Sequence, residues 1–176
     1  MRSGRILHTQ KGGTRVITAI CPGSFDPVTL GHLDIIQRAS DMFDKVIVAV
    51  LCNSKKHPSF TVEERMEMIR RVTTEIPNVE VATFDGLLAD FAAQQGATVL
   101  VKGLRAVTDF EYEFQMALAN RKLNPELETV FITTKAENMY LASSLVKEIA
   151  RNGGSIDDFV PAELRDEIQK RLCKGE

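Results

Sequence analysis

The sequence predicts a doubly wound α/β fold, in which a five-stranded parallel sheet carries helices on both faces. Short apolar runs of strand length alternate with segments of helical periodicity along most of the chain. This alternation is typical of a parallel sheet that is covered on both sides. The 176 residues suit one domain, and no repeat, low-complexity tract or linker divides them. We therefore expect a single domain over residues 16–176.

The expected strands are apolar runs bounded by polar or glycine-containing segments. They cover residues 16–21, 45–51, 79–84, 98–101 and 129–133. The segments between them repeat apolar side chains every three or four residues, which predicts helices. These helices cover residues 33–43, 61–72, 87–95, 110–124, 144–152 and 161–172. Thr61 and Glu64 have the spacing of a capping box at the start of the second helix.

Composition excludes several classes of protein. The 22 basic residues are balanced by 24 acidic ones, so no broad basic surface points to a nucleic acid partner. No apolar segment approaches membrane-spanning length, and we expect no membrane partner. The cysteines Cys21, Cys52 and Cys173 lack metal-ligand spacing and fit a reducing cytoplasm. We expect residues 1–15, which are polar and basic, to be a flexible N-terminal extension.

The most informative segment covers residues 22–32, between the first strand and the first helix. Gly23 and Pro27 shape a turn that brings His32 to the start of the helix. Backbone N–H groups at a helix start lack partners and attract anions. The segment therefore indicates a phosphate site of a Rossmann-like sheet, at the carboxyl end of a strand. The alternative is that the turn is only structural and that His32 only caps the helix.

Two further segments bring cations to strand ends. Lys55 and Lys56 follow the second strand, where a flexible lysine can reach a phosphate, although a solvent-exposed loop tip explains them equally well. Residues 102–113 follow the fourth strand and contain two more cations beside a glycine that permits close approach of a ligand. The alternative there is a charged loop in which Asp109 and Glu111 pair with these cations. The aromatic residues in and just after this segment, Phe110, Tyr112 and Phe114, are expected to pack in the helix.

The last such segment covers residues 138–144, before the fifth helix. We expect one of its two serines to cap that helix. A helix that starts with Ser143 and Ser144 also offers hydroxyl and N–H donors to a polyphosphate. The two roles are compatible, so the segment is a second candidate phosphate site.

The sequence of residues 22–32, with Gly-Ser-Phe-Asp-Pro followed by Gly-His, resembles the signature of the nucleotidylyltransferase superfamily. The resemblance implies that the turn binds the α- and β-phosphates of ATP and that His32 stabilises a pentavalent α-phosphorus. Ser24 stands where the superfamily often has threonine, and Thr29 stands where many members have histidine.

The later segments narrow this resemblance. Residues 60–65, 102–113, 120–121 and 143–148 are similar to the phosphopantetheine adenylyltransferase family, and the similarity runs in order from about residue 19 to residue 159. The family resemblance implies transfer of the adenylyl group of ATP to 4′-phosphopantetheine, giving dephospho-coenzyme A and pyrophosphate. It also implies Mg²⁺ bound with the ATP, no metal held by the protein itself, and a homohexamer.

The resemblance implies roles for individual positions. The catalytic residues would be His32, Lys56 and Arg105. ATP would be contacted by Ser24, Phe25, His32, Gly103, Leu104, Arg105, Glu113, Asn138, Met139, Tyr140, Leu141, Ala142, Ser143 and Ser144. The second substrate would be contacted by Ser24, Lys56, Leu88 and Lys102. Two positions depart from the family pattern, because Lys102 is often arginine and Ala142 replaces the first of three serines.

The expected chemistry is direct in-line attack without a covalent enzyme intermediate. A phosphomonoester has its second pKa at about 6, so the attacking oxygen is mostly ionised at neutral pH and needs no general base. The protein has to align two anions and stabilise the charge that develops. One alternative is a related adenylyl- or cytidylyltransferase with another acceptor, and a second is a nucleotide sensor without catalytic activity.

Overall fold

The computed structural model describes residues 16–52 and 57–173. The expected N-terminal extension lies outside these residues. The strands are β1 (Thr18–Gly23), β2 (Lys45–Leu51), β3 (Val79–Phe84), β4 (Val99–Leu104) and β5 (Glu128–Thr133). The helices are α1 (Leu30–Met42), α2 (Val62–Val72), α3 (Leu88–Gln94), α4 (Val107–Leu123), α5 (Ser143–Arg151) and α6 (Arg165–Cys173). Two short 3₁₀ turns, Ala136–Asn138 and Ala162–Leu164, precede α5 and α6.

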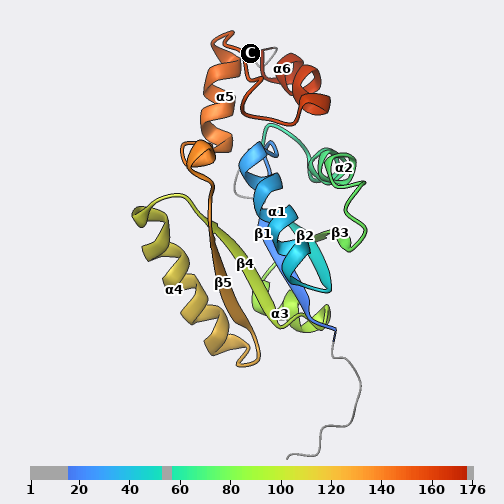
Figure 1. Cartoon of the computed structure of the whole chain (residues 1–176), viewed down its shortest axis with the longest axis vertical. Helices are drawn as coiled ribbons and strands as arrows, with labels where there is room; N and C mark the ends of the chain where they lie inside the picture. Colours follow the sequence, from blue (N-terminus) through green and yellow to red (C-terminus); the bar gives the residue numbers. More distant parts are fainter. Residues whose placement is uncertain (1–15, 53–56, 174–176) are drawn as a thin grey trace, which may run out of the picture.

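The strands form one parallel sheet in the order β3-β2-β1-β4-β5, which confirms the doubly wound α/β fold (Figure 1). The chain moves outward from β1 to β3 and then returns to place β4 on the other side of β1. The switch in direction therefore lies between β1 and β4. In such sheets the ligand site lies beyond the carboxyl ends of the strands at this point.

Alternating residues of the strands supply two separate apolar cores. On one face, strand residues such as Cys21, Val48 and Val101 pack with residues of α1, α2, α5 and α6. On the other face, Ile20 and Leu100 pack with residues of α3. Helix α4 contacts β4, β5 and α3 on this second side. The expectation of helices on both faces is confirmed.

Several boundaries differ from those expected. Strand β1 is Thr18–Gly23 instead of 16–21, and α4 begins at Val107 instead of residue 110. Three further differences have a local reason. Helix α1 begins three residues earlier than expected, at Leu30, because Thr29 caps it. Strand β4 continues beyond its expected end to Leu104, because its pairing with β5 extends to Leu104 and Thr133. The segment after Pro161 first forms a 3₁₀ turn, and α6 begins only at Arg165.

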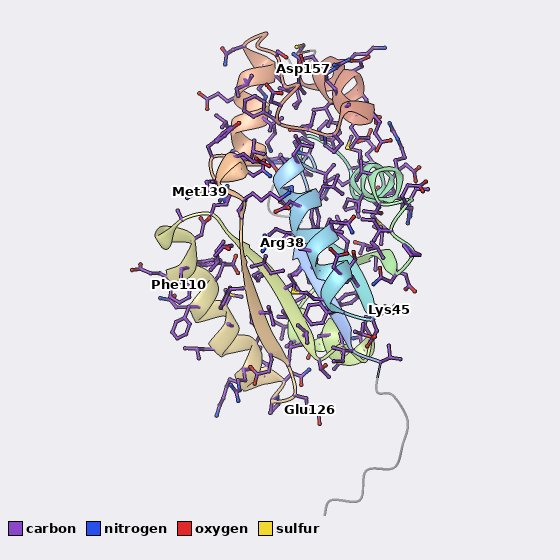
Figure 2. All side chains as sticks on the ribbon, in the orientation of Figure 1. Arg38, Lys45, Phe110, Glu126, Met139 and Asp157 are labelled. Atoms are coloured by element: carbon purple, nitrogen blue, oxygen red, sulfur yellow. The ribbon has the colours of Figure 1, made fainter. Side chains whose placement is uncertain are left out.

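Helix α4 covers the sheet but presents much apolar surface to the outside. Tyr112, Phe114 and Leu118 are 64%, 46% and 55% exposed. The expectation that the aromatic residues pack against neighbours holds only in part. The Phe110 ring meets Phe131 edge-on at 5.8 Å and stacks on Phe114 at 5.5 Å. Figure 2 shows α4 at the margin of the molecule, with side chains projecting away from the sheet.

Within the described part of the chain, no helix has the length and apolar character needed to cross a membrane.

We predict that Leu100→Ala lowers the free energy of unfolding by about 2–5 kcal/mol, because Leu100, the second residue of β4, is fully buried. The matched control is Leu87→Ala, which removes the same atoms from a side chain that is 54% exposed. This control should change stability by less than about 0.5 kcal/mol. Urea denaturation of both variants measures the difference, and equal losses would contradict the assigned core.

Candidate active site

The cleft lies where the switch in strand direction places it, at the carboxyl ends of β1 and β4. It has a volume of about 680 Å³, within the range of small-molecule sites. Its lining comes from the β1–α1 turn, the end of β4, the start of α4 and the start of α5. The lining residues are Cys21, Pro22, Gly23, Ser24, Phe25, Thr29, Gly31, His32, Ile35, Ile36, Val101, Lys102, Gly103, Arg105, Asp109, Tyr112, Glu113, Thr134, Asn138, Leu141, Ala142, Ser143 and Ser144.

His32 occupies the third position of α1 and forms a reciprocal cap with Thr29. The backbone N–H of His32 donates to Thr29 Oγ1 at 3.3 Å, and the backbone N–H of Thr29 donates to His32 Nδ1 at 3.1 Å. The Thr29 hydroxyl oxygen lies 3.0 Å from the same nitrogen. Because Nδ1 accepts a hydrogen bond from a backbone N–H, it carries no proton. The proton of the neutral ring is therefore on Nε2.

The surroundings keep His32 neutral. Burial lowers the pKa of its imidazole to about 4, and the positive charge of Arg105 acts in the same direction. At neutral pH the ring is thus an uncharged donor through Nε2–H. Such a donor can bind an oxygen whose negative charge grows during a reaction. It cannot act as a nucleophile through Nε2, because that nitrogen has no free lone pair.

The turn before His32 has a strained backbone at Phe25. This residue has a φ of 49°, in the left-handed region that residues other than glycine rarely adopt. Its ring is buried and meets the His32 ring edge-on, with centroids 5.0 Å apart. Gly23 makes room for the turn, because a Cβ there would lie 2.9 Å from the Phe25 ring. The strained turn therefore places the Phe25 ring against the imidazole ring of His32.

The end of β4 brings two cations to the cleft, and each is paired with a carboxylate of α4. Lys102 Nζ lies 3.0 Å from Glu113 Oε2, although without the angles of a hydrogen bond. Arg105 donates to both oxygens of Asp109, at 3.0 and 3.3 Å, and to the carbonyl of Leu141 at 3.0 Å. The carboxylate partners differ from those of the charged-loop alternative, since Glu113 takes the place of Glu111.

The backbone at the end of β4 lies close to α1 on the same side of the cleft. Gly103 lies against α1, where a Cβ would come within 3.0 Å of Ile35 Cγ1. The absence of a side chain thus lets the end of β4 reach the first turns of α1. This contact keeps Lys102 and Arg105 beside the turn that carries His32.

The fourth segment supplies hydroxyl groups, but the expected serine cap is wrong. The residue before α5 is Ala142, which makes no side-chain cap. Ser143 is instead the first residue of the helix, and its hydroxyl donates to the carbonyl of Pro27 at 2.7 Å. This hydrogen bond joins α5 to the β1–α1 turn. Ser144 is exposed and lines the cleft.

The structure brings most of the expected site residues together. Ser24, Phe25, His32, Lys102, Gly103, Arg105, Glu113, Asn138, Leu141, Ala142, Ser143 and Ser144 line one cleft. Four others lie outside this lining, namely Leu88, Leu104, Met139 and Tyr140. Met139 lies between β5 and α5 (Figure 2), and Leu88 packs against the second core. Lys56 lies outside the described residues.

Sequence reasoning missed three contributors to the site. Thr29 lies at capping distance from His32, but the usual Glu or Gln of a capping box is absent, so the pattern gave no signal. Tyr112 lines the cleft rather than packing against neighbours. Arg65 is 3% exposed and donates to the carbonyls of Ser24 and Leu51, at 2.6 and 3.2 Å. Arg65 lies four positions before the buried Ile69, and this helical spacing could have placed Arg65 on the buried face of α2.

Cys21 lies on the floor of the cleft. Burial raises the pKa of its thiol to about 12, while the charge of Lys102 opposes this effect. The thiol is therefore neutral at pH 7 and a poor nucleophile. This agrees with its interpretation as a small buried residue.

Comparison with known proteins first identifies the class of protein to which the chain belongs. The sequence pattern of the cytidylyltransferase-like family matches residues 20–149, so the fold and the cleft are those of a nucleotidyltransferase. A phosphopantetheine adenylyltransferase from Caldanaerobacter subterraneus subsp. tengcongensis is 55% identical over 157 residues, covering 89% of this chain and 98% of the relative. One from Symbiobacterium thermophilum is 54% identical and covers 90% and 98% of the two chains. The chain therefore belongs to the phosphopantetheine adenylyltransferase family.

Two solved structures share the fold at low identity. The nicotinic acid mononucleotide adenylyltransferase of Plasmodium falciparum, complexed with NaAD, has a TM-score of 0.65 and 15% identity, over 89% of this chain and 96% of its own. The lipopolysaccharide core biosynthesis protein of Thermoplasma volcanium has a TM-score of 0.53 and 21% identity, over 69% and 99%. These likenesses show the fold alone.

We predict that His32 stays neutral, with its proton on Nε2, from pH 8 down to about pH 5, because its pKa lies near 4 instead of 6.5. Since the pKa is lowered in the folded state, folding stability declines as the pH falls from about 6.5 towards 4. Nitrogen-15 NMR of the imidazole measures the tautomer and the titration. A midpoint near 6.5, or a proton on Nδ1, would contradict the capped arrangement.

Proposed function

We propose that this protein transfers the adenylyl group of ATP to 4′-phosphopantetheine, giving dephospho-coenzyme A and pyrophosphate. The observation that carries the proposal is the position of His32, whose Nε2–H is available in a cleft with Lys102 and Arg105. One uncharged donor and two cations are suited to holding phosphates and to stabilising charge that develops on one of them. The identity of 54–55% to the named relatives supports the choice of acceptor.

The transfer proceeds by direct in-line attack. An oxygen of the acceptor phosphate forms a bond to the α-phosphorus of ATP while the bond from that phosphorus to the bridging oxygen breaks. Pyrophosphate leaves with the electron pair of the broken bond. His32 donates its Nε2–H to an oxygen of the α-phosphate, where negative charge is stabilised in the transition state. Neither His32 nor the neutral thiol of Cys21 supplies a nucleophile for a covalent intermediate.

The proposal also assigns contacts with ATP or with the acceptor to individual residues. Ser24 would contact both substrates from the β1–α1 turn, and Lys102 would bind the acceptor phosphate. Arg105 would exchange part of its hydrogen bonding with Asp109 for ATP phosphates. Glu113 Oε2, which is buried and accepts no hydrogen bond within the described residues, would accept one from ATP. Lys56 and Leu88 keep their proposed roles with the acceptor phosphate and the pantetheine arm.

Magnesium would arrive with the ATP. Within residues 16–52 and 57–173, no group of three or more histidine, cysteine, aspartate or glutamate side chains could hold a metal ion. The carboxylates of Asp109 and Glu113 each face a cation instead. The ligands of Mg²⁺ would thus be phosphate oxygens and water, and the ion would offset charge on the pyrophosphate.

The proposal extends to assembly and location. Apolar side chains of α4, among them Phe110, Phe114 and Leu118, are exposed, and a homohexamer would cover them. Residues 16–176 would form one nucleotidyltransferase domain that works in the cytoplasm, where free thiols such as those of Cys21, Cys52 and Cys173 persist.

We predict that the protein releases pyrophosphate from ATP when 4′-phosphopantetheine is the acceptor, because its cleft aligns two phosphates without a general base. Nicotinamide mononucleotide and a phosphorylated alcohol serve as the alternative acceptors. A coupled pyrophosphate assay measures turnover with each. Turnover with nicotinamide mononucleotide but not with 4′-phosphopantetheine would overturn the proposal, and ATP binding without any turnover would identify a sensor.

We predict that His32→Ala lowers kcat by a factor of roughly 10²–10³, because its hydrogen bond strengthens in the transition state. The KM for ATP should change by less than about threefold, since the ground state uses this donor little. Steady-state kinetics separates the two quantities. The matched control is His57→Ala, which removes an exposed histidine from outside the cleft lining. Parallel losses in ATP affinity and kcat would reduce His32 to a binding residue.

A further inference from the structure

Asp26 is a nearly buried carboxylate in the β1–α1 turn, with 6% exposure, and the proposed reaction gives it no role. Its Oδ1 accepts from the backbone N–H of Phe60 at 3.0 Å. Its Oδ2 accepts from the backbone N–H of Ser59 at 3.1 Å and from Lys147 Nζ at 2.7 Å. One side chain thus connects the turn, the segment before α2, and helix α5.

Helix α5 reaches the turn through two residues that are one helical turn apart. Ser143 donates to the carbonyl of Pro27, and Lys147 donates to the side chain of Asp26. Residues four positions apart lie on the same face of a helix, so both contacts come from one face of α5. The backbone N–H of Leu30 adds a third contact, to the carbonyl of Phe159. The turn is therefore held from the C-terminal part of the chain.

The segment at Ser59 and Phe60 is held from two further sides. Arg65 donates to the carbonyl of Phe60 at 3.1 Å and also to that of Ser24 at 2.6 Å. The guanidinium of Arg171, from α6, lies over the Phe60 ring at 5.4 Å from its centroid. Arg65 has no carboxylate within ion-pair distance in the described part of the chain. Asp26 therefore supplies the buried negative charge at this junction, with Lys147 as its ion-pair partner, while the partly exposed Glu64 carboxylate pairs with Arg171.

We propose that Asp26 and Lys147 are positioning residues that hold the segment at Ser59 and Phe60 in register with the β1–α1 turn. This inference rests on the proposed function, because that segment follows the stretch in which Lys56 is assigned to the acceptor phosphate. Loss of the Lys147 ammonium leaves a nearly buried carboxylate without its charge partner. The carboxylate then draws in water and holds the two N–H groups less firmly. The segment shifts relative to the turn, and binding of the acceptor weakens before binding of ATP does.

The first test is kinetic and compares Lys147→Met with Lys147→Arg. We expect Lys147→Met to raise the KM for 4′-phosphopantetheine about tenfold, while the KM for ATP and kcat each change by less than about threefold. Lys147→Arg keeps the charge and should restore the acceptor KM to within about threefold. The matched control is Arg71→Met, which removes an ion pair of the same 2.7 Å length between α2 and α6. A lower kcat with both KM values unchanged, or no rescue by arginine, would overturn the proposal.

The second test does not depend on activity. Hydrogen exchange of the Ser59 and Phe60 amides should become about tenfold faster in Lys147→Met and stay unchanged in Arg71→Met. Unchanged exchange of these amides in Lys147→Met would refute the positioning role, whatever the acceptor. A wild-type protein that shows no turnover with 4′-phosphopantetheine would instead refute the proposed function. The two failures are therefore distinguishable.

Discussion

The reciprocal hydrogen bonds between Thr29 and His32 decide both where α1 begins and where the histidine carries its proton. Thr29 Oγ1 satisfies a free N–H at the helix start, and the backbone N–H of Thr29 occupies Nδ1. The same residues therefore serve the fold and the site. Because the cap uses a backbone donor, the tautomer of His32 follows from the path of the chain. Other contacts of the turn, to α2, α5 and the segment at Ser59, keep that path in place.

Charge in the cleft is local and internally balanced, in keeping with a chain whose formal net charge is −2. Helix α4 places Asp109 and Glu113 one turn apart, so each carboxylate faces one cation of the β4 end. Incoming phosphates would compete with these carboxylates for Lys102 and Arg105. Such competition lowers the free energy gained when a single anion binds, and it favours a ligand that contacts both cations at once. ATP beside a phosphorylated acceptor is such a combination.

Local patterns were sufficient to predict part of the structure. Strands β2 and β3 match the expected ranges. Strand β2 is a continuous apolar run after Lys45, and β3 repeats apolar residues at Val79 and Val81 with the period of a strand. The gathering of His32, Lys102 and Arg105 followed from the parallel direction of the strands, whose carboxyl ends share one edge of the sheet. The serine cap failed because the Ser143 hydroxyl donates to Pro27, which lies 116 positions away in the chain. The burial of Arg65 likewise depends on carbonyls from distant segments, and no local pattern encodes their positions.

The central claim is that the chain holds two phosphates for direct transfer, with His32 as a neutral donor rather than a nucleophile. The stereochemistry at the α-phosphorus tests this most directly, using ATP made chiral at that atom with sulfur or oxygen isotopes and 4′-phosphopantetheine as the acceptor. A single in-line displacement predicts inversion of configuration in the dephospho-coenzyme A product. Retention of configuration would show two displacements, and therefore a covalent enzyme intermediate that contradicts this account.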